Sequence, residues 1–410
     1  MITILKDKHI VLGVTGSIAC YKAVDLASKL TQAGALVDVI LTESAQQFVT
    51  PLTFQSVTGR PVYTSLWDNS QDGLPTHIAH VGLAEDADLL IIAPATANTL
   101  AKLAHGIADN LLCVTALAAN CPVMIAPAMD GNMYMHPAVQ ANLKTLIGRG
   151  ATLIPPEEGR FASGLVGLGR LPETPTLIGH IRRVLGSISG ALFGQKVVIS
   201  AGGTREPIDP VRYITNRSSG KQGHALAQAA IDNGARVVVL ITTSDQPIPV
   251  GVKAIYVDTA QAMLQAVLEH SADADLLIMA AAVADFRPAT VADQKIKKSG
   301  SDGLTLQLAR TADILNEVKL QREQTGYPRM VIGFAAESEN LLKNARDKLE
   351  RKGLDLLVAN DITAPDAGFS VDTNRVVILD AEGGNYPVEL ANKSTISEMI
   401  LSRAAALLRD

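Results

Sequence analysis

The sequence predicts an α/β protein with two doubly wound, Rossmann-like domains. Short continuous apolar runs alternate with amphipathic helical patterns, and this alternation restarts near residue 190. Continuous apolar strands are typical of parallel sheets that helices cover on both faces. The 410 residues exceed the ~250–300 at which single cores stop growing, so we expect domains at 1–190 and 191–410.

The expected elements follow one another in regular order. In the first half, strands are predicted at 9–14, 36–41, 88–93, 122–126 and 151–154, and helices at 17–33, 44–58, 97–120 and 137–149. In the second half, strands are predicted at 195–200, 236–241, 275–280, 330–335, 355–359 and 375–379, and helices at 220–233, 259–270, 311–324, 338–352 and 393–408.

The segment between the two halves has a different composition. Residues 155–175 are rich in Gly, Pro and charge, and we expect a loop without regular structure, of the length that usually serves a function such as a lid. An amphipathic stretch at 176–187 leads into residues 187–190, the predicted domain linker.

Composition excludes several classes of protein. The net charge is −5, which argues against the basic surface that a nucleic-acid binder needs. Cys20, Cys113 and Cys121 form no C-x-x-C pair, so neither a disulfide framework nor a zinc site is expected. Charged residues at 6–8 interrupt any signal peptide, and no run reaches the ~18 apolar residues of a membrane span. We therefore expect a cytoplasmic protein with small-molecule ligands.

A phosphate site is predicted at the first strand–helix turn. Strand 9–14 runs into a turn that contains Gly13, Gly16 and Ser17 and leads into a helix, where free N–H groups favour an anion. The dinucleotide fingerprint G-x-G-x-x-G is missing from this turn, and Asp38 lies within the next strand instead of at its end. A mononucleotide is therefore favoured over NAD, although a tight turn without a ligand is an equal alternative.

Two further loops of the first half follow strands in the same way. Thr96, Asn98 and Thr99 come directly after strand 88–93, and a polar segment at 127–134 comes after strand 122–126. The carboxyl ends of parallel strands face the ligand crevice. Each loop could simply cap a helix, but three such loops meeting at one edge favour a ligand site.

The second half carries a different set of polar residues at strand ends. Ser219 and Gly220 open a helix without a Walker sequence, which predicts another anion cradle. Asp285 follows strand 275–280, and Lys348 and Lys352 share one helix face. Together with Phe334 they suit a metal-bound triphosphate and a base; for each lysine alone, a solvated helix face is the alternative.

These motifs resemble a known enzyme family. The first half is similar to flavin-containing cysteine decarboxylases, and nearly the whole chain resembles the bacterial bifunctional phosphopantothenoylcysteine decarboxylase/phosphopantothenate–cysteine ligases. The motifs are G-x-x-G-S-I-A at 13–19, T-H-I at 76–78, P-A-T-A-N-T at 94–99, P-A-M-x-x-x-M at 127–133, D-P-V-R-Y at 209–213, N-x-x-S-G-K-x-G at 216–223, A-D-F at 284–286 and K-I-K-K at 295–298.

For the first half, the resemblance implies a flavodoxin-like domain with bound FMN. The flavin would oxidise the cysteinyl thiol and so provide an electron sink for loss of CO2, with His77 as the catalytic histidine. The implied FMN contacts are Gly16, Ser17, Ile18, Thr42, Thr96, Ala97, Asn98 and Thr99.

Two catalytic positions of the first half depart from the family pattern. Asp130 stands where the family has Asn, and an ionised carboxylate cannot donate to a substrate carboxylate. Ser163 stands where the family has a cysteine that completes reduction of the enethiol, and a hydroxyl is a weaker acid than a thiol. An active ligase fused to a flavin module that does not complete the decarboxylation is therefore an alternative.

For the second half, the resemblance implies a ligase of coenzyme A biosynthesis. CTP would activate 4′-phosphopantothenate as an acyl-cytidylate, cysteine would displace CMP, and the flavin half would then yield 4′-phosphopantetheine. Asn216, Arg212 and Lys295 match the catalytic positions. The implied nucleotide contacts are Met279, Ala280, Ala281, Asp285, Lys295, Ala312, Asp313, Ile314, Leu315, Phe334, Lys348 and Lys352.

The resemblance also implies partners that the residues themselves do not show. Mg²⁺ is expected on the triphosphate, but no protein ligands for it are identified. Residues alone do not rank CTP over ATP. The family implies a homo-oligomer, with trimeric contacts around the flavin and dimeric contacts in the ligase.

Overall fold

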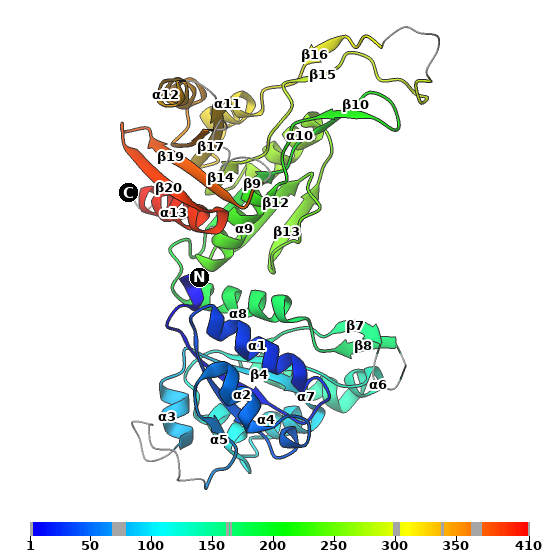
Figure 1. The fold of residues 1–410 in the computed structure, drawn as a ribbon, viewed down its shortest axis with the longest axis vertical. Coiled ribbons are helices and arrows are strands. Elements are labelled where there is room, and N and C mark those ends of the chain that lie inside the picture. Colours follow the sequence, from blue (N-terminus) through cyan, green and yellow to red (C-terminus); the bar gives the residue numbers. More distant parts are fainter. Residues whose placement is uncertain are drawn as a thin grey trace. The chain divides into compact units, whose positions relative to one another are not determined.

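The computed structural model describes residues 3–67, 79–160, 164, 166–297, 304–337, 340–361 and 371–408. The chain divides into two compact units, Met1–Leu185 and Gly186–Asp410, and each is described by itself (Figure 1). Helix α8 (Thr174–Ser189) runs through the expected linker. The prediction of a linker at 187–190 was therefore wrong for residues 187–189, which complete the last turn of α8.

The first unit is built on a six-stranded parallel sheet with the order β3-β2-β1-β4-β5-β6. Its strands are β1 (His9–Val14), β2 (Leu36–Leu41), β3 (Val62–Tyr63), β4 (Leu89–Ala95), β5 (Val123–Pro127) and β6 (Thr152–Leu153). Its helices are η1 (Thr3–Leu5), α1 (Cys20–Gln32), η2 (Ala45–Gln47), α2 (Pro51–Thr58), α3 (Ala79–Glu85), α4 (Ala97–His105), α5 (Leu111–Ala118), α6 (Gly131–Met135), α7 (Pro137–Gly148) and α8.

Helices cover both faces of this sheet, as the apolar strands predict. Ile10 and Leu12 of β1 belong to one buried cluster, which α1 and α8 complete. Val11, between them, belongs to a second cluster with α4, α5 and α7. Because side chains alternate along a strand, a strand that is apolar at every position fills two cores at once.

The structure corrects several predicted elements of this unit. The helix expected at 44–58 is two segments, because Pro51 starts α2 as its first residue. The helix expected at 97–120 is also two, because Gly106 ends α4 with a φ of 69°. The loop expected at 155–175 contains the antiparallel hairpin of β7 (Glu157–Arg160) and β8 (Val166–Arg170).

The second unit has an eight-stranded sheet with the order β13-β12-β9-β14-β17-β18-β19-β20. Its strands are β9 (Lys196–Ala201), β12 (Val237–Thr242), β13 (Val252–Tyr256), β14 (Leu276–Met279), β17 (Met330–Glu337), β18 (Leu356–Asp361), β19 (Thr373–Asp380) and β20 (Asn385–Asn392). Its helices are α9 (Lys221–Asp232), α10 (Ala260–Ser271), α11 (Ile314–Thr325), α12 (Leu341–Lys352) and α13 (Lys393–Leu407).

This second sheet is mixed. The six strands from β13 to β18 are parallel, but β19 and β20 pair antiparallel with their neighbours. The sequence prediction missed β13 and β20; in β20 only Val388 is buried, so this strand forms no continuous apolar run. Val197 and Val198 belong to different buried clusters, so this sheet is also doubly covered.

Two short ribbons extend from the second unit. One pairs β10 (Arg205–Pro207) with β11 (Tyr213–Thr215), and the other pairs β15 (Phe286–Pro288) with β16 (Leu308–Arg310). Figure 1 shows both projecting beyond the sheet. They follow β9 and β14, which are neighbours in the sheet. Among the described residues, no helix combines the length and apolarity that a bilayer span requires.

Candidate active sites

In the first unit, a polar site lies where the strand order reverses direction. β1 and β4 are neighbours, and the chain proceeds from them to opposite edges of the sheet, which is the usual place for a ligand crevice. Thr15 joins the two loops there. Its Oγ1 donates to the carbonyl of Pro94 over 2.8 Å and accepts from the N–H of Thr96 over 3.0 Å.

The predicted flavin contacts gather around this crossing. Thr96 caps α4 by accepting from the N–H of Thr99, and Thr42 N donates to Val14 O over 3.1 Å at the end of β1. A Cβ on Gly16 would come within 2.4 Å of Ser44 Cβ. The loops therefore approach so closely that only glycine fits there.

Asp130 has a local role that its sequence pattern did not reveal. It is the N-cap of α6, and its Oδ1 accepts the N–H of Asn132 over 2.9 Å. Asparagine can cap a helix in the same way. The hairpin lies beside this loop, because Met129 N donates to Gly169 O over 3.0 Å. His77 and Ser163 fall outside the described residues.

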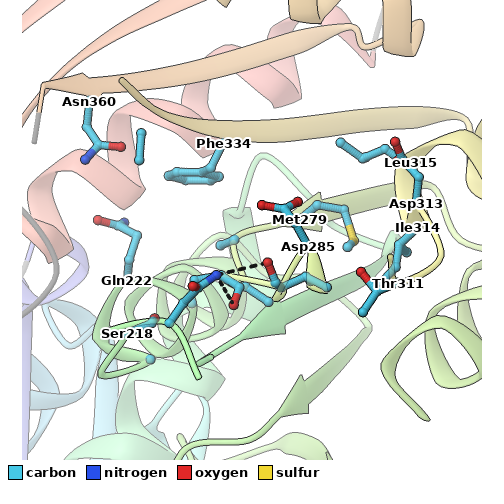
Figure 2. A pocket seen from close by; sticks show the side chains of 18 of the residues that line it. Ser218, Gln222, Met279, Asp285, Thr311, Asp313, Ile314, Leu315, Phe334 and Asn360 are labelled. Atoms are coloured by element: carbon cyan, nitrogen blue, oxygen red, sulfur yellow. Dashed lines mark hydrogen bonds between the residues drawn. The ribbon is translucent and has the colours of Figure 1, made fainter. Parts of the chain in front are cut away.

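In the second unit, a cavity of about 1100 Å³ opens at the equivalent crossing. β9 and β14 are neighbours there, and α9 begins between the loops that follow them. Figure 2 shows Gln222 and Asn360 at one end, Thr311 to Leu315 at the other, and Asp285 and Phe334 between them. This volume is at the upper end of the range of ~300–1,000 Å³ that is typical of small-molecule sites.

Asn216 reaches from the β10–β11 hairpin to the loop after β14. Its Nδ2 donates to the carbonyls of Val283, over 3.0 Å, and Ala282, over 3.3 Å. Ala282 N in turn donates to Gly202 O over 2.8 Å. The amide therefore holds two of the cavity's loops together, while the exposed side of Asn216 lines the cavity.

One end of the cavity is cationic through α12. Lys348 Nζ donates to Phe334 O over 2.8 Å, and Lys352 pairs with Asp313 and with Asn316 Oδ1 at 2.9 Å. Burial opposes ionisation of Asp313, but the hydrogen bond from Lys352 outweighs it and lowers the pKa of that carboxyl. The pair of Lys352 and Asp313 therefore lies at the start of α11.

The other end contains two lysines that the sequence prediction did not assign to the site. Lys221 and Lys393 are the first residues of α9 and α13, where the helix dipole disfavours a cation. Lys221 pairs with Asp372 at 2.6 Å, and the buried Lys393 donates to Val371 O. Burial and Lys221 lower the pKa of Lys393. A lysine at the first position of a helix was the signal that could have identified them.

The structure places most of the predicted nucleotide contacts together. The cavity is lined by Met279, Ala280, Ala281, Asp285, Ala312, Asp313, Ile314, Leu315, Phe334, Lys348 and Lys352. Lys295 and Arg212 lie outside this lining. Arg212 instead contacts Asp209 and the carbonyl of Ile296, so it lies beside the segment that carries the exposed Lys295.

These two sites define a class of protein: a two-unit α/β enzyme with a polar site in each unit where the strand order reverses direction. Residues 3–186 match the model of the Flavoprotein family, and residues 192–408 match that of the DNA/pantothenate metabolism flavoprotein C-terminal domain. The chain is 46% identical over 409 residues to the coenzyme A biosynthesis bifunctional protein CoaBC of Bacillus subtilis, covering 99% of this chain and 98% of that protein.

A second relative gives the same result. The CoaBC protein of Vibrio vulnificus is 42% identical over 405 residues, covering 98% of this chain and 99% of that protein. A solved C-terminal domain of a CoaBC protein is 35% identical, with a TM-score of 0.46, and covers 54% of this chain and all of that one. The chain belongs to the family of bifunctional CoaBC proteins of coenzyme A biosynthesis, with a flavoprotein decarboxylase half and a ligase half.

Proposed function

We propose that the second unit joins cysteine to 4′-phosphopantothenate, with CTP as the activating nucleotide. The observation that carries this proposal is the cavity, which has cationic groups at both ends and a helix N-terminus along one side. Two phosphorylated substrates must bind together for a carboxylate to meet a nucleotide. A cavity with one anion-binding end would hold only one of them.

The arrangement suits a reaction in two displacements. The substrate carboxylate attacks the α-phosphorus of CTP and pyrophosphate leaves; the cysteine amine then attacks the acyl carbon and CMP leaves. Lys348 and Lys352 would hold the nucleotide at the α11 end, and the N–H groups of α9 would hold the acid's phosphate. Asn216, which lines the same cavity, would orient the acyl group.

For the first unit, we propose FMN as the flavin and phosphopantothenoylcysteine as the substrate. When bound, the flavin accepts two electrons from the cysteinyl end, which makes loss of CO2 possible. The Gly16 turn and the Thr96 loop would hold its phosphate and ring edge. Asp130 would act as a helix cap and orient the 127–135 loop, His77 would be the catalytic histidine, and Ser163 would have to serve in place of the cysteine that completes reduction of the enethiol.

Similarity over both halves favours two activities over an active ligase fused to a flavin module that does not complete the decarboxylation. The test is to incubate the purified chain with phosphopantothenate, cysteine, Mg²⁺ and CTP, and to weigh the products. Saturated 4′-phosphopantetheine supports both steps. An enethiol, two hydrogens lighter than 4′-phosphopantetheine, would mean that Ser163 does not complete the reduction. Accumulated phosphopantothenoylcysteine would contradict the decarboxylase assignment, and absence of ligation would contradict the ligase assignment.

Several finer features belong to the same proposal. Mg²⁺ would be held mainly by the triphosphate, since no cluster of three His, Cys, Asp or Glu side chains occurs among the described residues. Exposed apolar side chains on the two ribbons, including Tyr213 and Phe286, suit the dimeric contacts of the ligase half. Trimeric flavin halves and a cytoplasmic location remain predictions from the sequence. Light scattering measures the oligomer directly.

A further inference from the structure

A buried carboxylate connects the two segments that carry the predicted catalytic residues of the ligase. Asp209 lies in the β10–β11 hairpin, and its side chain is completely buried. Oδ1 accepts the N–H groups of Val211 at 2.8 Å and Arg212 at 2.9 Å. Oδ2 accepts Arg212 Nε at 2.9 Å and Nη2 at 2.5 Å.

The same carboxylate reaches the second segment. Oδ2 also accepts the N–H of Ile296 over 3.1 Å, and Arg212 Nη2 donates to Ile296 O over 2.6 Å. A further backbone bond runs from Ala292 N to Ile208 O over 3.0 Å. Both peptide groups of Ile296 are thus fixed by one Asp–Arg pair that belongs to another part of the chain.

The consequence falls on the residue before Ile296. The peptide plane between residues 295 and 296 is attached directly to the Cα of Lys295, so fixing the N–H of Ile296 fixes where the lysine stem starts. Lys295 is exposed, and a long side chain on a loose loop would lose conformational freedom on each turnover. A fixed stem removes part of this loss.

We propose that Asp209 is a positioning residue for ligation, which holds Arg212 and the backbone of Ile296 so that Lys295 is presented at a constant place. The inference rests on the proposed ligase function, because Lys295 matters only if it assists that reaction. Asp209 itself is buried and does not line the cavity. Its five hydrogen-bond donors outweigh the cost of burial and keep its pKa far below the ordinary range, so it holds the segment throughout neutral pH.

The test compares Asp209→Asn with Asp245→Asn, a control whose carboxylate is exposed and 3.9 Å from Arg205. An amide offers one acceptor oxygen and turns two N–H groups toward the donors around it. We expect kcat for ligation to fall roughly 10²-fold in Asp209→Asn, as misplacement by about an ångström can cause, with KM for CTP changed less than about threefold. Asp245→Asn should match the wild type.

A double-mutant cycle distinguishes positioning from a general structural role. If Asp209 acts through Lys295, Asp209→Asn should lower kcat little further in a Lys295→Ala background. A full additional loss would overturn the proposal, as would an Asp209→Asn enzyme that ligates at the wild-type rate.

Hydrogen exchange provides a readout that does not require ligase activity. The amide of Ile296 should be protected in the wild type and in Asp245→Asn, and should exchange at least tenfold faster in Asp209→Asn. If this protection changes but no variant, nor the wild type, ligates, the ligase assignment fails while Asp209 still holds the segment. Unchanged protection in Asp209→Asn would refute the role of Asp209 itself.

Discussion

Asp38 and Asp209 look alike as buried residues but connect different parts of the molecule. Each carboxylate is fully buried and accepts two nitrogens of one arginine, Arg60 in the first unit and Arg212 in the second. Asp38, however, also pairs with His9 at the start of β1, away from the carboxyl ends of the strands. Asp209 instead connects two segments beside the ligase cavity.

This difference shows that a buried Asp–Arg pair does not by itself indicate a functional site. The position of the pair relative to the sheet is what indicates one. The partners of Asp38 are His9 of β1 and Arg60, two residues after the end of α2, so Asp38 holds two parts of the scaffold together. The partners of Asp209 belong to segments that carry residues predicted to act on substrate. Loss of Asp38 should therefore affect stability, and loss of Asp209 should affect turnover.

The largest expected effect concerns the segment that Asp209 holds. Lys295→Ala should lower kcat for ligation by about 10²–10³, because it removes a cation aimed at charge that develops during the reaction. Lys297→Ala, on the same segment and equally exposed, is the matched control and should retain the wild-type rate. Equal losses in the two variants would mean that the segment contributes only general positive charge.

Asp38→Asn should destabilise the first unit by about 3–5 kcal/mol, the usual cost of breaking a buried pair and leaving its partner charged. Denaturant unfolding followed by flavin fluorescence would measure this loss. Ligation by the second unit should stay within about twofold of the wild type. A variant of unchanged stability would show that Asp38 does not fasten the scaffold.

Lys348 offers a smaller effect, limited to nucleotide binding. Lys348→Ala should raise KM for CTP about tenfold, the equivalent of ~1.4 kcal/mol, with little change in kcat. Lys343→Ala is the control, since Lys343 is exposed on the same helix and lies outside the cavity lining. If both variants raise KM equally, the effect comes from net charge instead of from the cavity.

The smallest effect is the pH dependence of the first unit's stability. The hydrogen bond to Asp38 raises the pKa of His9. The stability that protonated His9 contributes is therefore complete below pH ~6.5 and is lost as pH rises through the folded-state pKa. The pKa of Asp38 is lowered: burial opposes ionisation, but His9 and Arg60 outweigh it. The stability that ionised Asp38 contributes is present above pH ~3.9 and is lost in acid.

His9→Gln provides the measurement for this pH dependence. The difference in unfolding free energy between wild type and His9→Gln should be larger at pH 6 than at pH 9. A difference that does not vary with pH between these values would show that His9 is not charged in the folded protein.

The scaffold was largely predictable because its signals are local. β1, β9 and the other buried parallel strands are continuous apolar runs, and the helices between them have one apolar face. The hairpin β7–β8 was missed because its strands are rich in Gly and charge and so look like a loop, and β20 was missed because only one of its residues is buried.

The site was predictable only as far as its residues follow strands directly. Asn216, Asp285 and Phe334 stand near strand ends and line the cavity. Lys393 was missed although it directly follows β20, because the sequence prediction did not identify that strand, and Lys393 lies over 150 residues along the chain from Lys221. The contact between Asp209 and Ile296 also spans distant segments, and no local pattern indicates it.

The central claim is that the second unit activates a carboxylate by transfer of a nucleotidyl group. Phosphopantothenate labelled with ¹⁸O in its carboxylate tests this most directly, with mass analysis of the nucleotide after ligation to cysteine. If the carboxylate attacks the α-phosphorus, the CMP released must carry one ¹⁸O atom. Label in inorganic phosphate, together with formation of CDP, would mean attack at the γ-phosphorus and would contradict the mechanism.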